Sequence, residues 1–486
     1  MAAMARPLPP DFPIRSQLLA RLYDEQRRAG WIAPGFADAI ARELRLPVAE
    51  VWEAATSYAD FRSAPLIGDE VRCAGLSCQL ARGAFAEMPS EASHCLFRCY
   101  DAPATGGEEP FPAPMVRQAG PLLAPDITNT DRLNAARRLG RDAALNAVAE
   151  SGLRGRGGAY FPVGTKWRAA LEERRPIALV VNAEEGEPGV FKDRALLSLA
   201  PRRVVEGIAI AAFILEPAVI VVFANGQADP AVRSLEEALD IAEPQLDVAI
   251  VRGGGGYVLG EESALLNALE GRRPVPRTKP PYPVQSGLFG MPTVVNNIET
   301  FANLSVHFGD VPGFRTRGTP ETPGTKILSV SGRVRLPGAY EVPLGVSLRK
   351  VVEQSGPAVA GEVAVLAGGP SGGFLSAGHL DVPLQPGILH ATGAMLGAGG
   401  IVVLDAPGDI RDAALAMARF NAEESCGKCT PCREGTPRLY DLLAAGDVDG
   451  IDGLAEVIQF GSLCGLGQMA PGPVRSALHF WPGVFA

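Results

Sequence analysis

The sequence predicts a multidomain α/β protein, and three observations support this fold class. The chain has 486 residues, which is too long for one compact core. Residues 126–310 alternate helical patterns with apolar strand candidates, the arrangement expected of a sheet with parallel strands. The pattern changes to strands and turns over residues 325–402 and to helices over residues 410–480. The apolar strand candidates of the first block are residues 177–185, 218–226 and 247–255.

The part of the chain before residue 126 is predicted to contain helices and then a short cysteine-bearing segment. Apolar side chains recur at helical spacing at Leu18, Leu19, Leu22 and Tyr23, and again at Phe36, Ile40 and Leu44. Four cysteines follow among strand and loop patterns, and then a stretch rich in Pro, Gly and Ala. The expected domains are a helical bundle (1–65), a cysteine segment (66–105), a linker (106–125), an α/β domain (126–320), a small α+β domain (321–405) and a helical domain (406–486).

Composition excludes several classes of protein. The formal net charge is −9 and no stretch gathers Lys and Arg, which argues against a nucleic-acid-binding protein. The most apolar run contains Glu206, Glu216 and Pro217, so no stretch of about 18 uncharged residues could span a bilayer. The start of the chain lacks the apolar segment of a secretory signal. We therefore expect a cytoplasmic, reducing location, where clustered cysteines indicate metal ligands rather than disulfides.

The eight cysteines are divided into two sets of four. Cys73, Cys78, Cys95 and Cys99 form an N-terminal quartet, and Cys426, Cys429, Cys432 and Cys464 form a C-terminal quartet. No cysteine lies in the long stretch between them. Two complete quartets suggest two metal centres, as in a protein that carries electrons between a site in its middle and an outside partner.

The C-terminal quartet has the spacing of an iron–sulfur ligand set. Cys426, Cys429 and Cys432 follow the pattern Cys-x2-Cys-x2-Cys, and Cys464 is a remote fourth ligand. Three thiolates on one tight loop can hold three irons of a cubane, and the distant cysteine closes it. Zinc is the main competitor, because four-cysteine zinc sites also use Cys-x2-Cys pairs. The triple with two-residue gaps favours [4Fe–4S].

Four loops of the middle block carry glycines or acidic and amide side chains at predicted strand or helix ends. Residues 153–167 form a glycine-rich loop with Arg154, Arg156 and Lys166, suited to a phosphate. The other three are residues 182–194 with three glutamates, residues 253–263 with a glycine run, and residues 293–300 with two adjacent asparagines. Any one of them could be an ordinary surface loop. Four at strand ends in one α/β block predict a large nucleotide pocket.

With these motifs in place, residues 126–475 resemble the flavin-carrying, NADH-binding subunit shared by respiratory complex I, NAD-reducing hydrogenases and molybdenum- or tungsten-dependent formate dehydrogenases. The four loops, the β-rich insert and the C-terminal quartet occur in the family's order. The resemblance implies FMN in a Rossmann-like α/β domain, a β-grasp-like insert, a [4Fe–4S] cluster in a C-terminal helical bundle, and NAD(H) as substrate.

The resemblance also implies roles for individual residues. The implied FMN contacts are Arg156, Gly157, Lys166, Asn182, Glu184, Glu185, Tyr257, Gly260, Glu261, Glu262, Asn296 and Asn297. The implied NADH contacts are Phe161, Glu187, Lys279 and Tyr282. Phe161 and Tyr282 offer aromatic faces for stacking. Glu187 is the candidate for positioning the nicotinamide, and no general acid or base is assigned.

The chain departs from the family pattern at three positions. Tyr160 stands where the family usually has Gly, which is expected to add bulk in the flavin loop. Ala169 replaces a usual aromatic residue, so adenine stacking is expected to be weaker. Glu184 replaces the commoner Asp, a variation associated with the formate dehydrogenase branch. These departures concern NADH affinity and geometry rather than the presence of the flavin.

Residues 15–100 resemble the small subunit that accompanies this family, a helical bundle followed by a thioredoxin-like [2Fe–2S] domain. The pairs Cys73-x4-Cys78 and Cys95-x3-Cys99 match its ligand pairs. The sixteen residues between the pairs (79–94) are about half of the family's usual gap, so the thioredoxin-like domain is expected to be truncated. A working [2Fe–2S] centre and a metal-free vestige both remain possible, and the retention of all four ligands favours the working centre.

The predicted function is that of an NADH dehydrogenase (diaphorase) electron-transfer subunit. It would exchange a hydride between NAD(H) and FMN, and single electrons with the iron–sulfur clusters. The implied partner is another iron–sulfur or molybdopterin oxidoreductase subunit, in the first place the α subunit of a formate dehydrogenase. A diaphorase of an NAD-reducing hydrogenase or complex I-like enzyme is the alternative. A non-catalytic scaffold paralogue is a second alternative, suggested by Tyr160 and Ala169.

Overall fold

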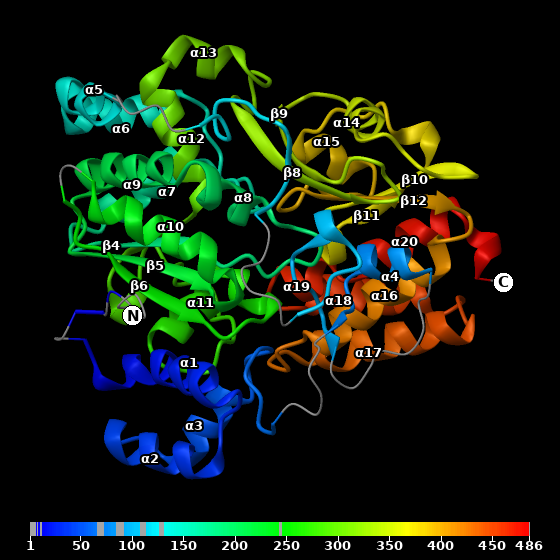
Figure 1. Ribbon diagram of the computed structural model, residues 1–486, viewed down its shortest axis with the longest axis horizontal. Coiled ribbons are helices and arrows are strands. Elements are labelled where there is room, and N and C mark those ends of the chain that lie inside the picture. The colour runs from blue at the N-terminus through cyan, green and yellow to red at the C-terminus, as the bar shows by residue number, and fades with distance from the viewer. Residues whose placement is uncertain are drawn as a thin grey trace.

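The computed structural model describes residues 6, 8–9, 12–65, 72–83, 92–106, 113–125, 131–242 and 245–485. Two large sheets and two helical groups organise this part of the chain (Figure 1). The mixed α/β fold class predicted from the sequence is confirmed. Among the described residues no helix is both long and apolar enough to cross a membrane.

The first sheet is parallel and Rossmann-like. Its strands are β4 (Ala178–Ala183), β5 (Val219–Asn225), β6 (Ala249–Gly253) and β7 (Thr293–Asn297), in the order β6-β5-β4-β7. The three predicted strands are β4, β5 and β6, and β7 ends in the asparagine pair. These strands are almost wholly buried because helices cover both faces, which explains their continuous apolar runs.

Alternate residues of each strand belong to two different cores. Leu179 and Val181 of β4 face the core that contains α9 (Pro201–Leu215), α10 (Asp229–Asp240), α12 (Ile298–Gly309) and α7 (Val163–Glu172). Ala178 and Val180 face a second core formed with α11 (Glu262–Leu269) and the N-terminal helices. The N-terminal helices are α1 (Leu18–Ala29), α2 (Pro34–Leu44) and α3 (Val48–Ala55), which lie below the sheet in Figure 1. The predicted helical bundle is therefore one cover of the α/β sheet.

The second sheet has the order β11-β10-β12-β8-β9-β3. Its strands are β3 (Val116–Gln118), β8 (Thr325–Gly332), β9 (Gly338–Pro343), β10 (Glu362–Ala367), β11 (Gly373–Leu375) and β12 (Gly400–Ala406), accompanied by α14 (Leu348–Ser355) and α15 (Pro386–Ala391). The segment predicted as a linker contributes β3, which pairs in parallel with β9. The carboxylate of Glu341 in β9 accepts the backbone N–H groups of Gly120, Leu122 and Leu123, so it fastens this segment to the sheet.

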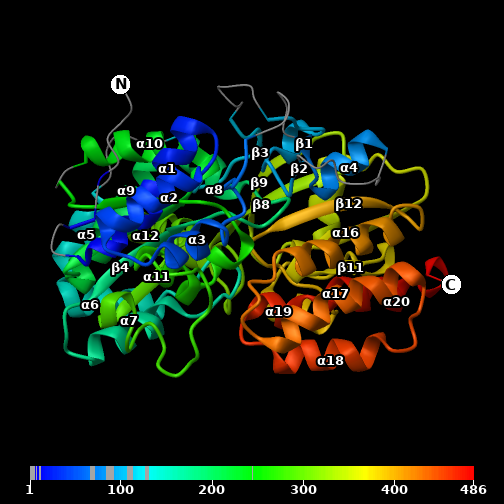
Figure 2. The same cartoon turned by 90° about the horizontal axis from the view of Figure 1, so that it is seen from below.

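The helices of the C-terminal region pack on the second sheet (Figure 2). They are α16 (Ile410–Glu423), α17 (Thr430–Ala445), α18 (Ile451–Gly461), α19 (Gly465–Met469) and α20 (Pro471–Phe480). The N-terminal cysteine segment consists of β1 (Arg72–Cys73), α4 (Leu76–Arg82) and β2 (Ala92–Ser93), with β1 and β2 parallel. Its Ser77 hydroxyl bonds to the Ser331 hydroxyl of β8 at 2.8 Å, so this segment is seated against the second sheet.

Candidate functional site

The four predicted loops meet at the carboxyl edge of the parallel sheet. A Cβ atom added to Gly157 in the glycine-rich loop would lie 3.2 Å from the Cβ of Asn297, at the end of β7. A Cβ on Gly186, after β4, would lie 3.2 Å from the carbonyl oxygen of Gly256, after β6. Parallel strands bring their carboxyl ends to one edge, which explains why loops far apart in the sequence touch. Glycine suits both contacts, because a Cβ atom at either position would be closer to its neighbour than most Cβ contacts are.

Polar side chains of the predicted site connect these loops. Lys166 Nζ lies 3.0 Å from Glu262 Oε2 and 3.2 Å from the Val295 carbonyl oxygen. Glu261 accepts the N–H groups of Ser263 and Ala264 at the start of α11, and its other oxygen lies 2.7 Å from Lys279 Nζ. The last two members are Asn182, whose amide reaches the Gly260 carbonyl at 3.5 Å, and Asn296, which accepts from the Trp167 indole at 3.0 Å. The structure thus gathers these residues in one place.

The two arginines of the glycine-rich loop both donate to backbone carbonyls, and Arg156 does so with its whole guanidinium. The Arg156 guanidinium is fully buried and donates to the carbonyls of Arg154 (2.9 Å), Pro323 (2.6 Å) and Thr325 (3.1 Å). Arg154 donates to the carbonyls of Glu321 and Tyr160. Both guanidinium groups therefore bind the protein's own backbone. A predicted flavin contact of Arg156 through its guanidinium would require these bonds to break.

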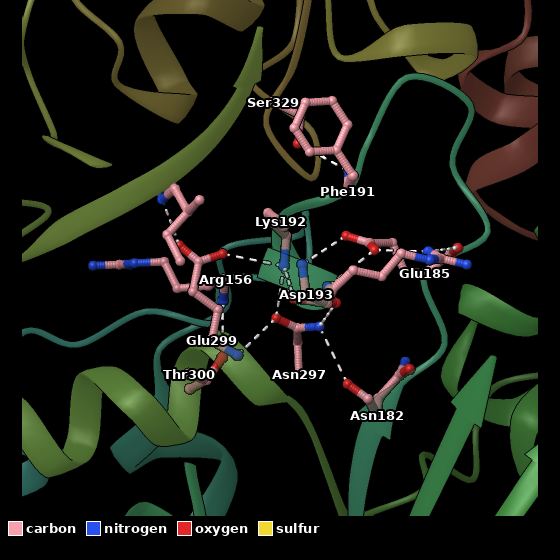
Figure 3. A network of polar contacts seen from close by, with 12 residues as sticks. Arg156, Asn182, Glu185, Phe191, Lys192, Asp193, Asn297, Glu299, Thr300 and Ser329 are labelled. Carbon is pink, nitrogen blue, oxygen red and sulfur yellow. Dashed lines mark hydrogen bonds and ion pairs between the residues drawn. The ribbon is translucent and has the colours of Figure 1, made fainter. Parts of the chain in front are cut away.

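A buried ionic network lies beside these loops and includes Asn297 at the end of β7 (Figure 3). Glu299 on α12 accepts from Lys326 Nζ at 2.6 Å and from the Ile327 N–H at 2.8 Å, and lies 3.1 Å from Lys192 Nζ. Lys192 also contacts Asp193 (2.5 Å) and Asn297 (3.0 Å). Burial alone would raise the pKa of Glu299, but Lys326 and Lys192 hold it below its usual value. Burial lowers the pKa of Lys326 to about 8.

The three glutamates after β4 are buried in different ways. Glu185 accepts hydrogen bonds from the Asp193 N–H at 2.7 Å and from the Arg194 guanidinium at 2.8 Å, so both of its carboxylate oxygens have partners within the protein. One oxygen of Glu184 accepts from Asn225 at 2.6 Å, and Glu184 Oε2 has no partner among the described residues. Glu187 Oε1 is likewise unpartnered there. Buried carboxyl oxygens without a partner fit a ligand that brings hydrogen-bonding groups of its own, as ribityl hydroxyls and the nicotinamide amide do.

Burial of Glu184 predicts a pH dependence of stability. Burial raises its pKa from 4.5 to about 8; Asp60 adds to the rise, while Asn225 and Arg194 oppose it. Between these values the folded flavin-free chain holds a proton that the unfolded chain has released. Glu184 alone is therefore expected to lower the free energy of unfolding by at most about 1.4 kcal/mol for each unit of rising pH, and Glu187, whose pKa burial also raises to about 8, adds to the fall. Thermal melting of the flavin-free protein across this range should show the fall, and Glu184→Gln should flatten it. An unchanged slope in Glu184→Gln would refute the assignment.

The aromatic candidates differ in exposure. Phe161 is 51% exposed and Tyr282 is 53% exposed, so both present a ring face for stacking. Tyr257 instead joins the loop after β6 (residues 253–263, called the β6 loop) to the second sheet, because its hydroxyl lies 2.5 Å from the hydroxyl of Ser371, between β10 and β11. Its N–H donates to Glu424 at 2.8 Å, just before Cys426. Val258, the next residue, lines the pocket of the C-terminal quartet. The β6 loop therefore adjoins both the predicted flavin pocket and these cysteines.

The four C-terminal cysteines line one small pocket together with Val258, Leu463 and Leu466. The N–H of Leu463 points at Cys429 Sγ (3.5 Å), and the Ser425 hydroxyl lies 3.2 Å from Cys432 Sγ. Burial raises the pKa of the Cys432 thiol to about 11, so a cationic centre is needed to keep it as a thiolate. Four thiols on an apolar pocket with N–H···S contacts are the donor set of an iron–sulfur cluster.

The N-terminal cysteines are also gathered and all four are buried. Cys73 contacts Cys78 and Cys95, and Cys95 contacts Cys99. Backbone N–H groups of Leu96, Phe97 and Ala104 donate to Cys73, Cys95 and Cys78 at 3.2–3.3 Å. Among the described residues no three or more His, Cys, Asp or Glu side chains are arranged to hold a single metal ion. The fit to an iron–sulfur cluster rests on the four convergent thiols and their N–H donors.

Comparisons with known proteins identify the family. Three family models match, described as Nuo51 FMN-binding domain (residues 148–306), NADH-ubiquinone oxidoreductase-F iron-sulfur binding region (412–486) and Thioredoxin-like [2Fe-2S] ferredoxin (10–86). The F subunit of the NADH-quinone oxidoreductase of Mycobacterium bovis is 39% identical over 369 residues, which cover 70% of this chain and 83% of the relative. The chain belongs to the family of these NADH-quinone oxidoreductase F subunits.

This member of the family is therefore an oxidoreductase subunit with an FMN-binding domain, a [4Fe–4S] region and a thioredoxin-like [2Fe–2S] domain, and NADH is its substrate. The predicted family, enzyme class and cofactors are confirmed. NADP-reducing hydrogenase subunit HndC of Solidesulfovibrio fructosivorans is 39% identical over 360 residues, which cover 69% of this chain and 73% of the relative. A chain in the crystal structure of NAD+-reducing [NiFe]-hydrogenase in the H2-reduced state superposes with a TM-score of 0.85 and 30% identity, covering 97% of this chain and 93% of the other.

Several residues that hold the candidate site in place were missed by the sequence reasoning. Asn225 ends β5 and donates to Glu184, and its position at a strand end was the available signal. Lys192 and Lys326 gave no such signal, because their roles depend on Glu299, far away in the sequence. Tyr160 also differs from the expectation. Its ring lies in the core of the second sheet rather than adding bulk to the flavin loop.

Proposed function

We propose that this chain is a diaphorase that exchanges a hydride with NAD(H) and passes electrons to a substrate-converting partner subunit. The observation that carries the proposal is the position of the β6 loop. Tyr257 and Glu261 belong to the predicted flavin site, and Val258 between them lines the pocket of the C-terminal quartet. FMN, when bound, supplies the conversion between two-electron and one-electron chemistry. Because this one loop contributes to both sites, the bound flavin and the C-terminal cluster would lie near each other, as electron transfer between them requires.

The chain's own residues would bind and orient the substrates. The exposed faces of Phe161 and Tyr282 offer stacking surfaces for the dinucleotide. Lys279, held by Glu261, is placed to reach a hydroxyl or phosphate. Glu187 would orient the nicotinamide amide. Glu184 and Asn182 at the end of β4, with Asn296 and Asn297 at the end of β7, would hold the flavin.

The two cysteine quartets would hold the clusters that carry the electrons, and one cavity connects both quartets with the β6 loop. A cavity of about 1100 Å³ is lined by Cys95 of the N-terminal quartet, by Cys426 of the C-terminal quartet and by Gly253–Gly256. Arg194 connects the N-terminal quartet to the loop after β4 (residues 182–194). It binds the Glu185 carboxylate, and its guanidinium lies 4.1 Å from the centroid of the Phe97 ring. The thioredoxin-like [2Fe–2S] match covers residues 10–86 and so includes Cys73 and Cys78 but not Cys95 and Cys99; that all four cysteines are the ligands is part of the proposal.

The partner is proposed to be the catalytic part of a hydrogenase-type complex. The likeness to the NAD+-reducing [NiFe]-hydrogenase chain extends over 97% of this chain, and so includes most of the N-terminal cysteine segment. This supports a hydrogenase partner over the α subunit of a formate dehydrogenase. The latter is the second candidate, favoured by Glu184 in place of the family's commoner Asp. A cytoplasmic location stays a prediction.

The deciding experiment is anaerobic reduction of the purified, cofactor-loaded chain by NADH, followed by EPR spectroscopy. We expect signals of one [4Fe–4S] and one [2Fe–2S] cluster, flavin bleaching, and NADH–ferricyanide activity. Bound flavin that NADH does not bleach would contradict the diaphorase proposal and favour a scaffold role. Nickel or molybdenum in the complex purified from its native source would distinguish a hydrogenase from a formate dehydrogenase partner.

A further inference from the structure

Tyr160 has a backbone conformation that is unusual for its residue type. Its φ is +53°, in the left-handed region where a Cβ atom is disfavoured. It stands at the end of a closed loop, because the Gly155 N–H donates to the Phe161 carbonyl at 2.9 Å and the Val163 N–H to the Leu153 carbonyl at 3.0 Å. Such a conformation persists only when surrounding contacts hold it. The contacts of the Tyr160 side chain therefore indicate the role of this residue.

The Tyr160 side chain leaves its own domain and enters the second sheet. It is 6% exposed and packs in the core that contains Leu328 of β8 and Leu396. Its hydroxyl donates to the Gly397 carbonyl at 3.2 Å. Gly158 adds a second contact, since a Cβ there would lie 3.4 Å from the Gly397 carbonyl carbon. The tip of the glycine-rich loop is thus clamped onto residues 396–400.

The same segment surrounds the carboxylate of Glu187. The Ala398 N–H donates to this carboxylate. Glu187 Oε1 lies where Cβ atoms on Gly397 and Gly400 would be 3.6 and 3.5 Å away, and Gly369 closes the site from another side at 3.0 Å. Because these glycines lack side chains, their backbones can approach this oxygen closely. The position of the Glu187 carboxylate therefore depends on where residues 397–400 lie.

We propose that Tyr160 is a positioning residue for NAD(H), which fixes the Phe161 ring and the Glu187 carboxylate relative to each other by clamping the glycine-rich loop onto residues 396–400. Phe161 follows Tyr160 directly, and Glu187 is held by Ala398, next to the hydroxyl's acceptor. The Tyr160 side chain thereby fixes the Phe161 ring, in the glycine-rich loop, relative to the Glu187 carboxylate, which residues 397–400 of the second sheet's domain hold. This inference rests on the proposed function, since it assumes that Phe161 and Glu187 bind NAD(H).

The first test is Tyr160→Phe, which removes the hydroxyl and keeps the buried ring. We expect the Kd for NAD+, measured by calorimetry on the FMN-loaded chain, and the KM for NADH to rise about 2- to 10-fold, the usual effect of one lost hydrogen bond. FMN content and kcat should stay unchanged. Tyr340→Phe is the matched control, because Tyr340 is 2% exposed in the same core and its hydroxyl donates to the Leu336 carbonyl at 2.7 Å, away from residues 396–400.

A double-mutant cycle with Glu187→Gln separates positioning from general destabilisation. If Tyr160 acts through Glu187, adding Tyr160→Phe to Glu187→Gln should change the Kd for NAD+ much less than it does in the wild-type background. An unchanged Kd in Tyr160→Phe, an equal rise in Tyr340→Phe, or strictly additive effects would each overturn the inference. A wild-type chain that binds FMN but not NAD+ would overturn the proposed function itself, so the two failures are distinguishable.

Discussion

Replacing Glu299 by Gln is expected to lower the free energy of unfolding by about 3–5 kcal/mol, the usual result of removing one partner from a buried ionic network. Glu299 is fully buried, and its carboxylate contacts both Lys326 (2.6 Å) and Lys192 (3.1 Å). Without the carboxylate, Lys326 and Lys192 would be left with Asp193 as the nearest negative charge, and keeping Lys326 protonated in this buried place would cost more. Chemical denaturation followed by circular dichroism measures the change.

The matched control is Glu43→Gln, which removes an exposed carboxylate that forms two bonds to Arg21, at 2.7 and 2.8 Å. Its expected cost is about 0–1 kcal/mol, because water screens and solvates both charges. Equal costs for the two variants would show that the buried network does not behave as described. FMN content of Glu299→Gln should also fall, since Lys192 bonds to Asn297 in the predicted flavin site.

The second large effect is expected at the C-terminal quartet. Cys464→Ala should abolish the [4Fe–4S] cluster, because the remaining three thiolates leave one iron of the cubane without a protein ligand. Cys464 lies in the same pocket as Cys426, Cys429 and Cys432, so the loss should be local. Iron and sulfide analysis with EPR of the reduced protein measures it. FMN and the N-terminal cluster should be retained.

Cys78→Ala is the reciprocal variant. It should remove the [2Fe–2S] signal and leave the [4Fe–4S] signal, because Cys78 is buried with Cys73 and bonded by the Ala104 N–H at the other quartet. A Cys464→Ala protein with full iron content, or a Cys78→Ala protein with an unchanged spectrum, would contradict the assignment of that quartet. Loss of both clusters in either variant would indicate unfolding rather than local ligand loss.

Local patterns predicted the strands, the ligand sets and the loops because their physical causes are local. The apolar runs of β4, β5 and β6 follow from burial on both faces of a parallel sheet, which needs no knowledge of the partner helices. The C-terminal triple is readable because three ligands of one cluster must lie on one tight loop. The loops that meet at the carboxyl edge follow from strand direction alone.

Other features depend on groups that meet only in the folded chain. Arg156 looked like a phosphate ligand, but its guanidinium satisfies carbonyls of residues 323 and 325, which no local pattern connects to it. Lys192, Glu299 and Lys326 are ordinary charged residues in the sequence and one buried network in the structure. Tyr160 was expected to add bulk in the flavin loop, and its left-handed backbone instead directs the ring into the second sheet.

The sequence by itself determined the class of this protein: a multidomain α/β chain with two cysteine quartets and a nucleotide pocket between them. Local sequence patterns were sufficient to predict this class, because ligand spacing and apolar runs are properties of short segments. Only the tertiary structure decided which charged side chains face the pocket and which bond to the protein itself and hold the loops. It also decided how Tyr160 connects the glycine-rich loop to the residues that hold Glu187. Those outcomes depend on burial and on contacts between distant segments, and burial decides whether a polar group binds a ligand or the protein itself.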